Sequence, residues 1–337
     1  MKIVHSHYLC NVDYTKDRIL YINRFCLSLQ VMKTVLITGG TGMLGTALTR
    51  ELLKKGYAVI ILTRSNRKIN KPGITYATWD IEKGTIDPEA ISNADYIVHL
   101  AGANLAGGRW TNKRKRIFTE SRVRSGGLLV KALKEIPNKV QAVISSSAIG
   151  FYGADEDGPG RPFVESDPPD HNFLGQLVLQ WEEAVGTVTS YVKRLVILRF
   201  AMILSTEGGA LKEFLMPLKF GVSTILGSGR QMVSWIHIDD ATGIIMASIE
   251  NENLKGVYNA VAPDVVSNKV LMRKIASNFN GSYIKARVPA GIIKLVFGEM
   301  SIEVLKSATV SSEKIINEQY EFLFPGLESA IQKLAAS

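Results

Sequence analysis

Three regularly spaced glycines carry the first chemical signal in this sequence. Gly39, Gly42 and Gly45 lie between an apolar run, 33–38, and an amphipathic stretch, 43–55, whose periodicity predicts a helix. The first turn of a helix leaves backbone N–H groups unpaired, and these groups bind a phosphate where no Cβ blocks the approach. The order strand, glycine turn, helix therefore predicts a dinucleotide-binding turn. Its other members are Thr41, Met43 and Leu44.

The end of the next predicted strand, 57–63, distinguishes the two nicotinamide dinucleotides. In dinucleotide folds an acidic residue at this place binds the ribose 2′-hydroxyl of NAD(H), whereas an arginine accommodates the 2′-phosphate of NADP(H). Here the strand is followed by Arg64 and Ser65, and no acidic residue competes with them. The sequence therefore favours NADP(H) over NAD(H), with Arg64 as the main determinant. The alternative interpretation is a solvated basic loop.

Later strand ends supply the remaining cofactor contacts. The predicted strand 74–78 leads to Asp80, which we expect to accept a hydrogen bond from the adenine amino group. The predicted strand 95–101 ends in small residues that let a ligand approach the backbone. The cofactor residues assigned to these ends, and to the end of the predicted strand 140–147, are Asp80, Leu100, Ala101, Gly102 and Ser145.

The elements that position these residues alternate between strand and helix. This alternation predicts an α/β fold: a doubly wound parallel sheet, Rossmann-like, with ligands outside the carboxyl ends of its strands. We expect the NADP-binding domain to comprise 33–205 and 235–261, and a smaller discontinuous C-terminal substrate lobe to comprise 206–234 and 262–337, with 313–335 providing an apolar helical face. Residues 1–31 lack a sustained period and are expected to lie outside the fold, a short capping helix being the alternative.

Composition narrows the class of protein. The chain has 337 residues, 46% of them hydrophobic, and a formal net charge of +9. The basic residues are scattered except over 109–124, so small anionic ligands explain the charge and no nucleic-acid partner is predicted. No apolar stretch is long enough to span a bilayer, which predicts a cytoplasmic protein without a membrane partner. Both cysteines precede the glycine turn, and no metal site is predicted.

A second group of motifs resembles a known family. The serine-rich strand end SSSAIGFYG, 145–153, together with the glycine turn, resembles the extended short-chain dehydrogenases/reductases. More narrowly, the chain is similar to the nucleoside-diphosphate-sugar-epimerase-like group of the NAD-dependent epimerase/dehydratase family, which carries a small C-terminal domain of unassigned function. The resemblance runs from residue 32 to the end. Its further motifs are RW at 109–110, WE at 181–182, SWIHIDD at 234–240, YNAVAP at 258–263 and GEM at 298–300.

The resemblance implies a catalytic serine and a Tyr-x-x-x-Lys pair, in which lysine lowers the tyrosine pKa and the phenol transfers a proton. Ser147 matches the serine. The segment 172–182, where the pair is expected, contains neither residue, and no tyrosine in the chain is followed by a lysine four positions later. Tyr152 is the predicted substitute, with simple packing as its alternative.

These features leave two classes of function open. One is an NADP(H)-dependent epimerase or oxidoreductase that acts on a sugar nucleotide or another small carbonyl or carbinol compound. The other is a catalytically weak or inactive protein that senses NADP(H) or binds a partner. The residues predicted to contact the substrate are Arg109, Trp110, Arg230, Trp235 and His237. The resemblance also implies a possible homodimer through the helices 113–133 and 173–185.

Overall fold

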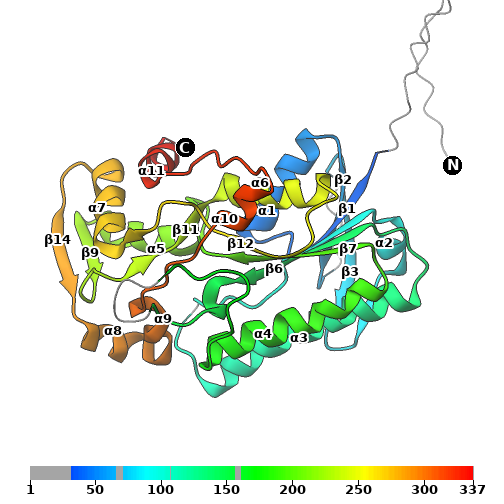
Figure 1. The fold of residues 1–337 in the computed structure, drawn as a ribbon, viewed down its shortest axis with the longest axis horizontal. Coiled ribbons are helices and arrows are strands. Elements are labelled where there is room, and N and C mark those ends of the chain that lie inside the picture. The colour runs from blue at the N-terminus through cyan, green and yellow to red at the C-terminus, as the bar shows by residue number, and fades with distance from the viewer. Residues whose placement is uncertain (1–31, 66–70, 107, 156–160, 337) are drawn as a thin grey trace, which may run out of the picture. The chain divides into compact units, whose positions relative to one another are not determined.

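The computed structural model describes residues 32–65, 71–106, 108–155 and 161–336, so the predicted N-terminal extension lies outside the described residues. Eight strands form one sheet in the order β12-β7-β6-β5-β1-β2-β3-β4 (Figure 1). Neighbouring strands are parallel except for β3 and β4. The strands are β1 Thr34–Thr38, β2 Ala58–Thr63, β3 Ile74–Asp80, β4 Thr85–Ile86, β5 Tyr96–His99, β6 Ala142–Ala148, β7 Arg194–Phe200 and β12 Gly256–Ala260.

This sheet confirms the predicted doubly wound α/β fold. Strand β1 pairs with β2 on one side and with β5 on the other, so the strand order reverses between β1 and β5. In such sheets the reversal opens a crevice outside the carboxyl ends of the strands. Central strands such as β5 and β6 are buried over nearly their whole length, which is typical of a parallel sheet covered on both faces.

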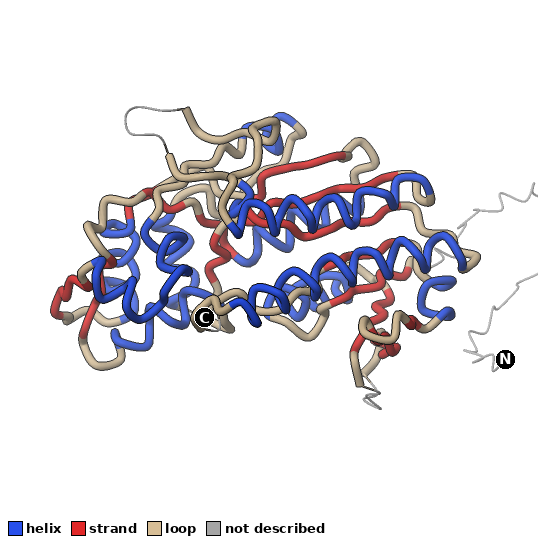
Figure 2. The backbone as a smooth tube through the Cα atoms, turned by 90° about the horizontal axis from the view of Figure 1, so that it is seen from below, coloured by secondary structure: helices blue, strands red, loops and turns tan. Residues whose placement is uncertain are grey.

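Helices cover both faces of the sheet. On one face, α1 Met43–Lys54 and α6 Ile238–Glu250 pack their apolar sides onto β1, β6 and β7. On the other face lie α2 Pro88–Asn93, α3 Asn112–Glu135 and α4 Phe173–Gly186. The two long helices α3 and α4 run side by side across that face (Figures 1 and 2). Helix α3 begins at Asn112, after Thr111, whose side chain accepts a hydrogen bond from the backbone N–H of Arg114.

A third core cluster lies in the C-terminal half of the chain. It unites α5 Gly209–Leu218, α7 Asn268–Phe279 and α11 Leu327–Ala335. Two helices provide the apolar face predicted over 313–335: α10 ends at Asn317, and residues 318–326, which include Pro325, separate it from α11. The remaining helices are α8 Ala290–Phe297, α9 Ser301–Leu305 and α10 Glu313–Asn317.

Three short strand pairs lie outside the main sheet. Strand β8 Met202–Leu204 pairs in parallel with β11 Trp235–His237, and β9 Val222–Leu226 pairs in parallel with β14 Ile284–Val288. The third pair, β10 Met232–Val233 with β13 Val266–Ser267, is antiparallel. Among the described residues, no helix has the length and apolar character needed to cross a membrane.

Candidate cofactor and substrate site

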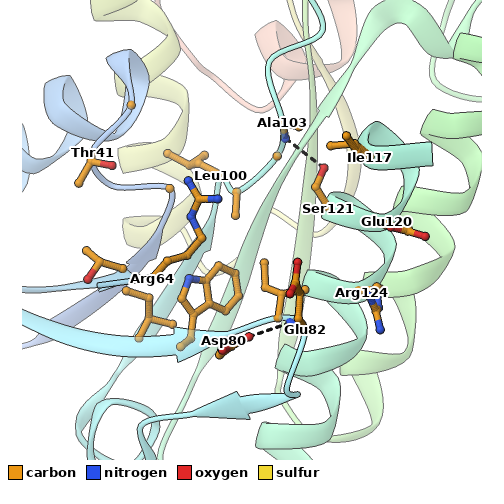
Figure 3. Close-up of a pocket in the computed structure, with 18 of the residues that line it drawn as sticks. Thr41, Arg64, Asp80, Glu82, Leu100, Ala103, Ile117, Glu120, Ser121 and Arg124 are labelled. Atoms are coloured by element: carbon orange, nitrogen blue, oxygen red, sulfur yellow. Dashed lines mark hydrogen bonds between the residues drawn. The ribbon is translucent and has the colours of Figure 1, made fainter. Parts of the chain in front are cut away.

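A cavity of about 770 Å³ lies at the carboxyl ends of β1, β2, β3 and β5, where the strand order reverses (Figure 3). Its walls bring together most of the predicted cofactor residues, although these come from four separate strand ends. The predicted residues that line it are Gly39, Thr41, Gly42, Arg64, Ser65, Asp80, Leu100, Ala101 and Gly102. Its size is that of an ordinary small-molecule site.

The three glycines of the turn have different structural roles in the cavity wall. Gly39 has a positive φ of 69°, and a Cβ there would lie 2.8 Å from the carbonyl of Leu100 at the end of β5. At Gly45 a Cβ would lie 2.6 Å from the carbonyl oxygen of Gly39. Gly42 precedes the first residue of α1 and faces the cavity. Two glycines therefore let helix, turn and strand pack closely, and the third leaves the helix N-terminus open to an anion.

Four predicted cofactor residues do not line this cavity. Met43 packs on the loop before α5, since a Cβ on Gly208 would lie 3.5 Å from its sulfur atom. Leu44 packs against the core beneath α1, and Gly45 is buried in the first turn of α1. Ser145 is 1% exposed, and its hydroxyl donates to the carbonyl oxygen of Ser146. These residues shape the turn and the strand end from inside the protein.

A buried hydrogen-bond chain joins the ends of β1 and β5. The Thr38 hydroxyl oxygen accepts hydrogen bonds from the backbone N–H groups of Leu100 and Ala101 and lies 2.7 Å from Nδ1 of His99. The Ser125 hydroxyl donates to the carbonyl oxygen of Arg122 and lies 3.3 Å from Nε2 of His99. This network requires a neutral His99 that accepts at Nδ1 and donates from Nε2. It holds the β5 end, one wall of the cavity, in place.

His99 predicts an acid sensitivity of the fold. Burial, aided by the positive charge of Arg122, lowers the pKa of His99 to about 4. The unfolded chain takes up this proton near pH 6.5 and the folded protein only near pH 4, so acid favours unfolding by about 3 kcal/mol between pH 7 and pH 4. The free energy of unfolding in urea should therefore fall between pH 7 and pH 4 in both proteins. We expect this fall to be about 3 kcal/mol smaller in His99→Asn than in the wild type. Equal losses in the two proteins would contradict a neutral buried His99.

Arg64 extends from the end of β2 into the cavity toward Leu100 (Figure 3). Within the described ranges, no hydrogen bond or ion pair joins its guanidinium group to another residue. Asp80 lines the same cavity, and its Oδ1 accepts hydrogen bonds from the backbone N–H groups of Lys83 and Glu82, which lower the pKa of this carboxyl. The cavity thus has a guanidinium group at one strand end and an ionised acceptor at the next.

Ser147 and Tyr152 belong to a buried polar network. The Ser147 hydroxyl donates to Oε1 of Glu182 over 2.5 Å, and the guanidinium group of Arg199 donates to both Glu182 oxygens over 2.8 Å. Arg199 also donates to the Tyr152 hydroxyl oxygen over 2.9 Å, and this hydroxyl donates to Oδ1 of Asn259 over 2.7 Å. Burial raises the pKa of Tyr152 to about 12, so its proton stays on the phenol at neutral pH.

Neither Ser147 nor Tyr152 lines the cofactor cavity or the second cavity described next. The structure brings the two predicted catalytic residues together through Glu182 and Arg199 rather than at an open site, and their catalytic role stays a prediction. The sequence carried one signal for this network: Arg199 is a charged residue that follows four consecutive apolar residues within a predicted buried strand.

A second cavity, of about 840 Å³, is lined by residues on both sides of the boundary predicted between the two lobes. From the main sheet side come Ile149 and Gly150, which directly follow β6, and Leu174 at the start of α4. A Cβ on Gly150 would overlap Leu174, so this glycine permits close packing there. Leu174 stands in the segment where the Tyr-x-x-x-Lys pair is expected, and it offers only hydrocarbon to the cavity.

Of the five predicted substrate residues, Trp110 lines the second cavity, and its indole N–H donates to the carbonyl oxygen of Leu105. Trp235 is fully buried and donates to the carbonyl oxygen of Asp264. His237 caps α6 by accepting from the backbone N–H of Asp239, and its ring packs on Phe324. The remaining two, Arg109 and Arg230, are exposed and line neither cavity.

The sheet order and the glycine turn at its reversal define a Rossmann-type dinucleotide-binding protein. Residues 35–260 match the NAD dependent epimerase/dehydratase family, and residues 288–334 match a domain of unknown function, DUF1731. The chain belongs to this epimerase/dehydratase family and has a site for an NAD(P)-type dinucleotide.

Relatives of known sequence and structure agree with this assignment. An epimerase family protein of Staphylococcus haemolyticus is 35% identical over 90% of this chain and 99% of its own length. The epimerase family protein YfhF of Bacillus subtilis is 32% identical over 90% of this chain and 98% of its own. A crystal structure of the human epimerase family protein SDR39U1 with NADPH has a TM-score of 0.79 and 29% identity, covering 90% of this chain and 99% of that one.

Proposed function

We propose that the protein binds NADP(H) in the cavity at the β1–β5 reversal and acts on a small carbonyl or carbinol compound in the second cavity. That cavity would lie between the dinucleotide domain, 33–205 with 235–261, and the substrate lobe, 206–234 with 262–337. The observation that carries the proposal is the guanidinium group of Arg64, which points into the first cavity from the end of β2 and has no partner among the residues that the structure describes. The NADPH in the structure of SDR39U1 supports the same choice.

Each wall of the first cavity suits one part of this cofactor. The N-terminus of α1, opened by Gly42, would hold the diphosphate, and Arg64 with Ser65 would hold the 2′-phosphate. Asp80 would accept a hydrogen bond from the adenine amino group through its second oxygen. NADPH, when bound, supplies reducing equivalents at its nicotinamide ring. The residues thus fit the group, and they bind and orient it without taking part in bond changes.

The choice of cofactor is tested by Arg64→Ala. We expect the variant to lose about 10- to 100-fold of its NADPH affinity, because a charge-assisted hydrogen bond to phosphate is worth roughly 1.5–3 kcal/mol, and to keep its NADH affinity. Titration calorimetry with each dinucleotide measures the ratio. Arg116→Ala is the matched control, since Arg116 carries the same charge on the exposed side of α3 and does not line the cavity. An unchanged NADPH/NADH ratio in Arg64→Ala would contradict the 2′-phosphate assignment.

One observation favours a second candidate, an NADP(H)-binding protein that regulates a partner without turnover. The sequence lacks a Tyr-x-x-x-Lys pair, and Leu174 occupies the cavity wall in the segment where the pair is expected. Oxidation of NADPH, followed at its absorbance band against carbonyl compounds and nucleotide sugars, separates the two candidates. Turnover with any of them supports the enzyme. Tight NADPH binding without turnover across the whole set supports the regulator.

A further inference from the structure

The wall of the second cavity is mainly hydrocarbon. It receives side chains from the loop before α3, from the end of β6, from β8, β9 and β10, and from α5, α8 and α9. Representative members are Trp110, Ile149, Phe214, Val233, Val296 and Val304. An apolar wall gains free energy by removing apolar ligand surface from water, at about 25 cal/mol per Å². The lining therefore selects for hydrocarbon in whatever compound fills it.

The charges in this wall oppose a diphosphate. The ionisable side chains that line it are Glu213, Glu303 and Lys306, which give two carboxylates against one ammonium group. Among the described residues, no arginine lines it. A nucleoside diphosphate brings two negative charges, and burying these without paired cations is costly. The wall offers a single ammonium group, Lys306, to the diphosphate that epimerases of nucleotide sugars would have to hold, and Glu303 already pairs with this group.

Most of the neutral polar groups in the wall are already bonded to the protein. The Ser234 hydroxyl donates to the carbonyl oxygen of Ala308 and accepts from the backbone N–H of Val310. The side-chain oxygen of Asn268 accepts from the backbone N–H of Leu226. These groups already form hydrogen bonds within the protein. The many hydroxyl groups of a sugar would therefore find few hydrogen-bond partners in this wall.

The ion pair at the end of α9 gives the wall a buried polar point for a ligand. The Lys306 ammonium group donates to Oε2 of Glu303 over 2.7 Å and to the carbonyl oxygen of Tyr152 over 3.0 Å. Their side chains are only 9% and 17% exposed, respectively. An ammonium group has three N–H donors. Within the described residues two of them have partners at Lys306, so the third can serve a ligand. That N–H can donate to a single acceptor atom on a bound compound.

We propose that the second cavity binds an apolar small molecule with one hydrogen-bond acceptor, such as a long-chain ketone, rather than a nucleoside-diphosphate sugar. The hydrocarbon wall holds the body of the compound, and Lys306 holds its oxygen. This inference deepens the proposed function by giving its substrate class, and only its link to the cofactor rests on that function. The ligand class itself follows from the wall alone.

Displacement of a fluorescent apolar probe tests the ligand class. The wild-type protein, with and without saturating NADPH, is loaded with N-phenyl-1-naphthylamine and titrated with 2-hexanone, 2-octanone, 2-decanone or UDP-glucose. We expect the ketones to displace the probe, with affinity rising by about tenfold or more from the shortest to the longest, because each buried CH₂ contributes roughly 0.8 kcal/mol. UDP-glucose should leave the probe in place. Displacement by UDP-glucose without displacement by the ketones would overturn the proposal.

Variants at two neighbouring positions on α8 test whether the probe binds in this cavity. Val296 lines the cavity and is 53% exposed, whereas Leu295 is 74% exposed and does not line it. We expect Val296→Glu to weaken probe binding by about tenfold, because it brings a further carboxylate into the apolar wall, and Leu295→Glu to change it by less than about twofold. Both positions are exposed enough to accept glutamate in a folded chain.

The same set of proteins separates failure of this inference from failure of the proposed function. NADPH affinity, measured by calorimetry, should be equal in the wild type and in both α8 variants. If NADPH does not bind while the ketones displace the probe, the proposed function fails and the ligand class stands. If NADPH binds while Val296→Glu and Leu295→Glu bind the probe equally, the second cavity is not the apolar site.

Discussion

Replacing Gly45 with alanine should abolish useful NADPH binding. The new Cβ would lie 2.6 Å from both the carbonyl oxygen of Gly39 and Cα of Gly40, and these are backbone atoms of the turn itself. Relief requires α1 to move away from the turn whose N–H groups are expected to bind the diphosphate. We expect a loss of about 100-fold or more in NADPH affinity, since several charge-assisted hydrogen bonds depend on this geometry. Calorimetry measures the affinity, and circular dichroism checks that the variant is folded.

A second glycine provides the control for this prediction. Gly127 lies in α3, and a Cβ there would meet no atom within 4 Å. Gly127→Ala should keep the NADPH affinity and stabilise the helix by up to about 1 kcal/mol, because alanine loses less backbone freedom than glycine on folding. If Gly45→Ala is folded and binds NADPH within about threefold of the wild type, the close packing of α1 on the turn does not shape the phosphate site.

The dinucleotide half of the site was readable from the sequence because its determinants are local. The glycine turn is contiguous, and Arg64 directly follows a strand, so strand, turn and helix order placed both at the same edge of the sheet. The edge strand β12 was missed as a strand, because its five residues include the buried polar Asn259 and form no apolar run. Its place in the sheet depends on pairing with β7, which local sequence does not encode.

The second cavity was not readable in the same way. Its wall combines Trp110, Leu174, Val233 and Val296, which are far apart in the chain and are ordinary core residues by type. Only tertiary packing makes them neighbours. The Tyr152 environment shows the same limit, because the residue that holds its hydroxyl, Arg199, lies on a strand whose other residues are apolar apart from Arg194 at its start. Long-range pairing, rather than local pattern, determines both.

The largest loss of stability is expected from Glu182→Leu. Glu182 and Arg199 form a bidentate pair whose side chains are 10% and 4% exposed, and Arg199 also packs over the ring of Phe151 at 3.5 Å. Burial alone would lower the pKa of Arg199, but Glu182 outweighs this effect and holds that pKa above its usual value. Removing the carboxylate leaves a buried unpaired cation, so we expect the free energy of unfolding in urea to fall by about 3–5 kcal/mol.

A double variant shows why Glu182→Leu loses stability: either because Arg199 is left as a buried, unpaired cation, or because the Glu182–Arg199 pair itself is lost. In Glu182→Leu with Arg199→Met both charges are gone, and hydrocarbon of similar volume fills their place, so most of the stability should return. A remainder of about 1–3 kcal/mol should persist, because Ser147 and Tyr152 each lose a hydrogen-bond partner in the buried network. If the double variant is no more stable than Glu182→Leu alone, the loss comes from the pair itself, and the cost of the single change is not that of an uncompensated charge.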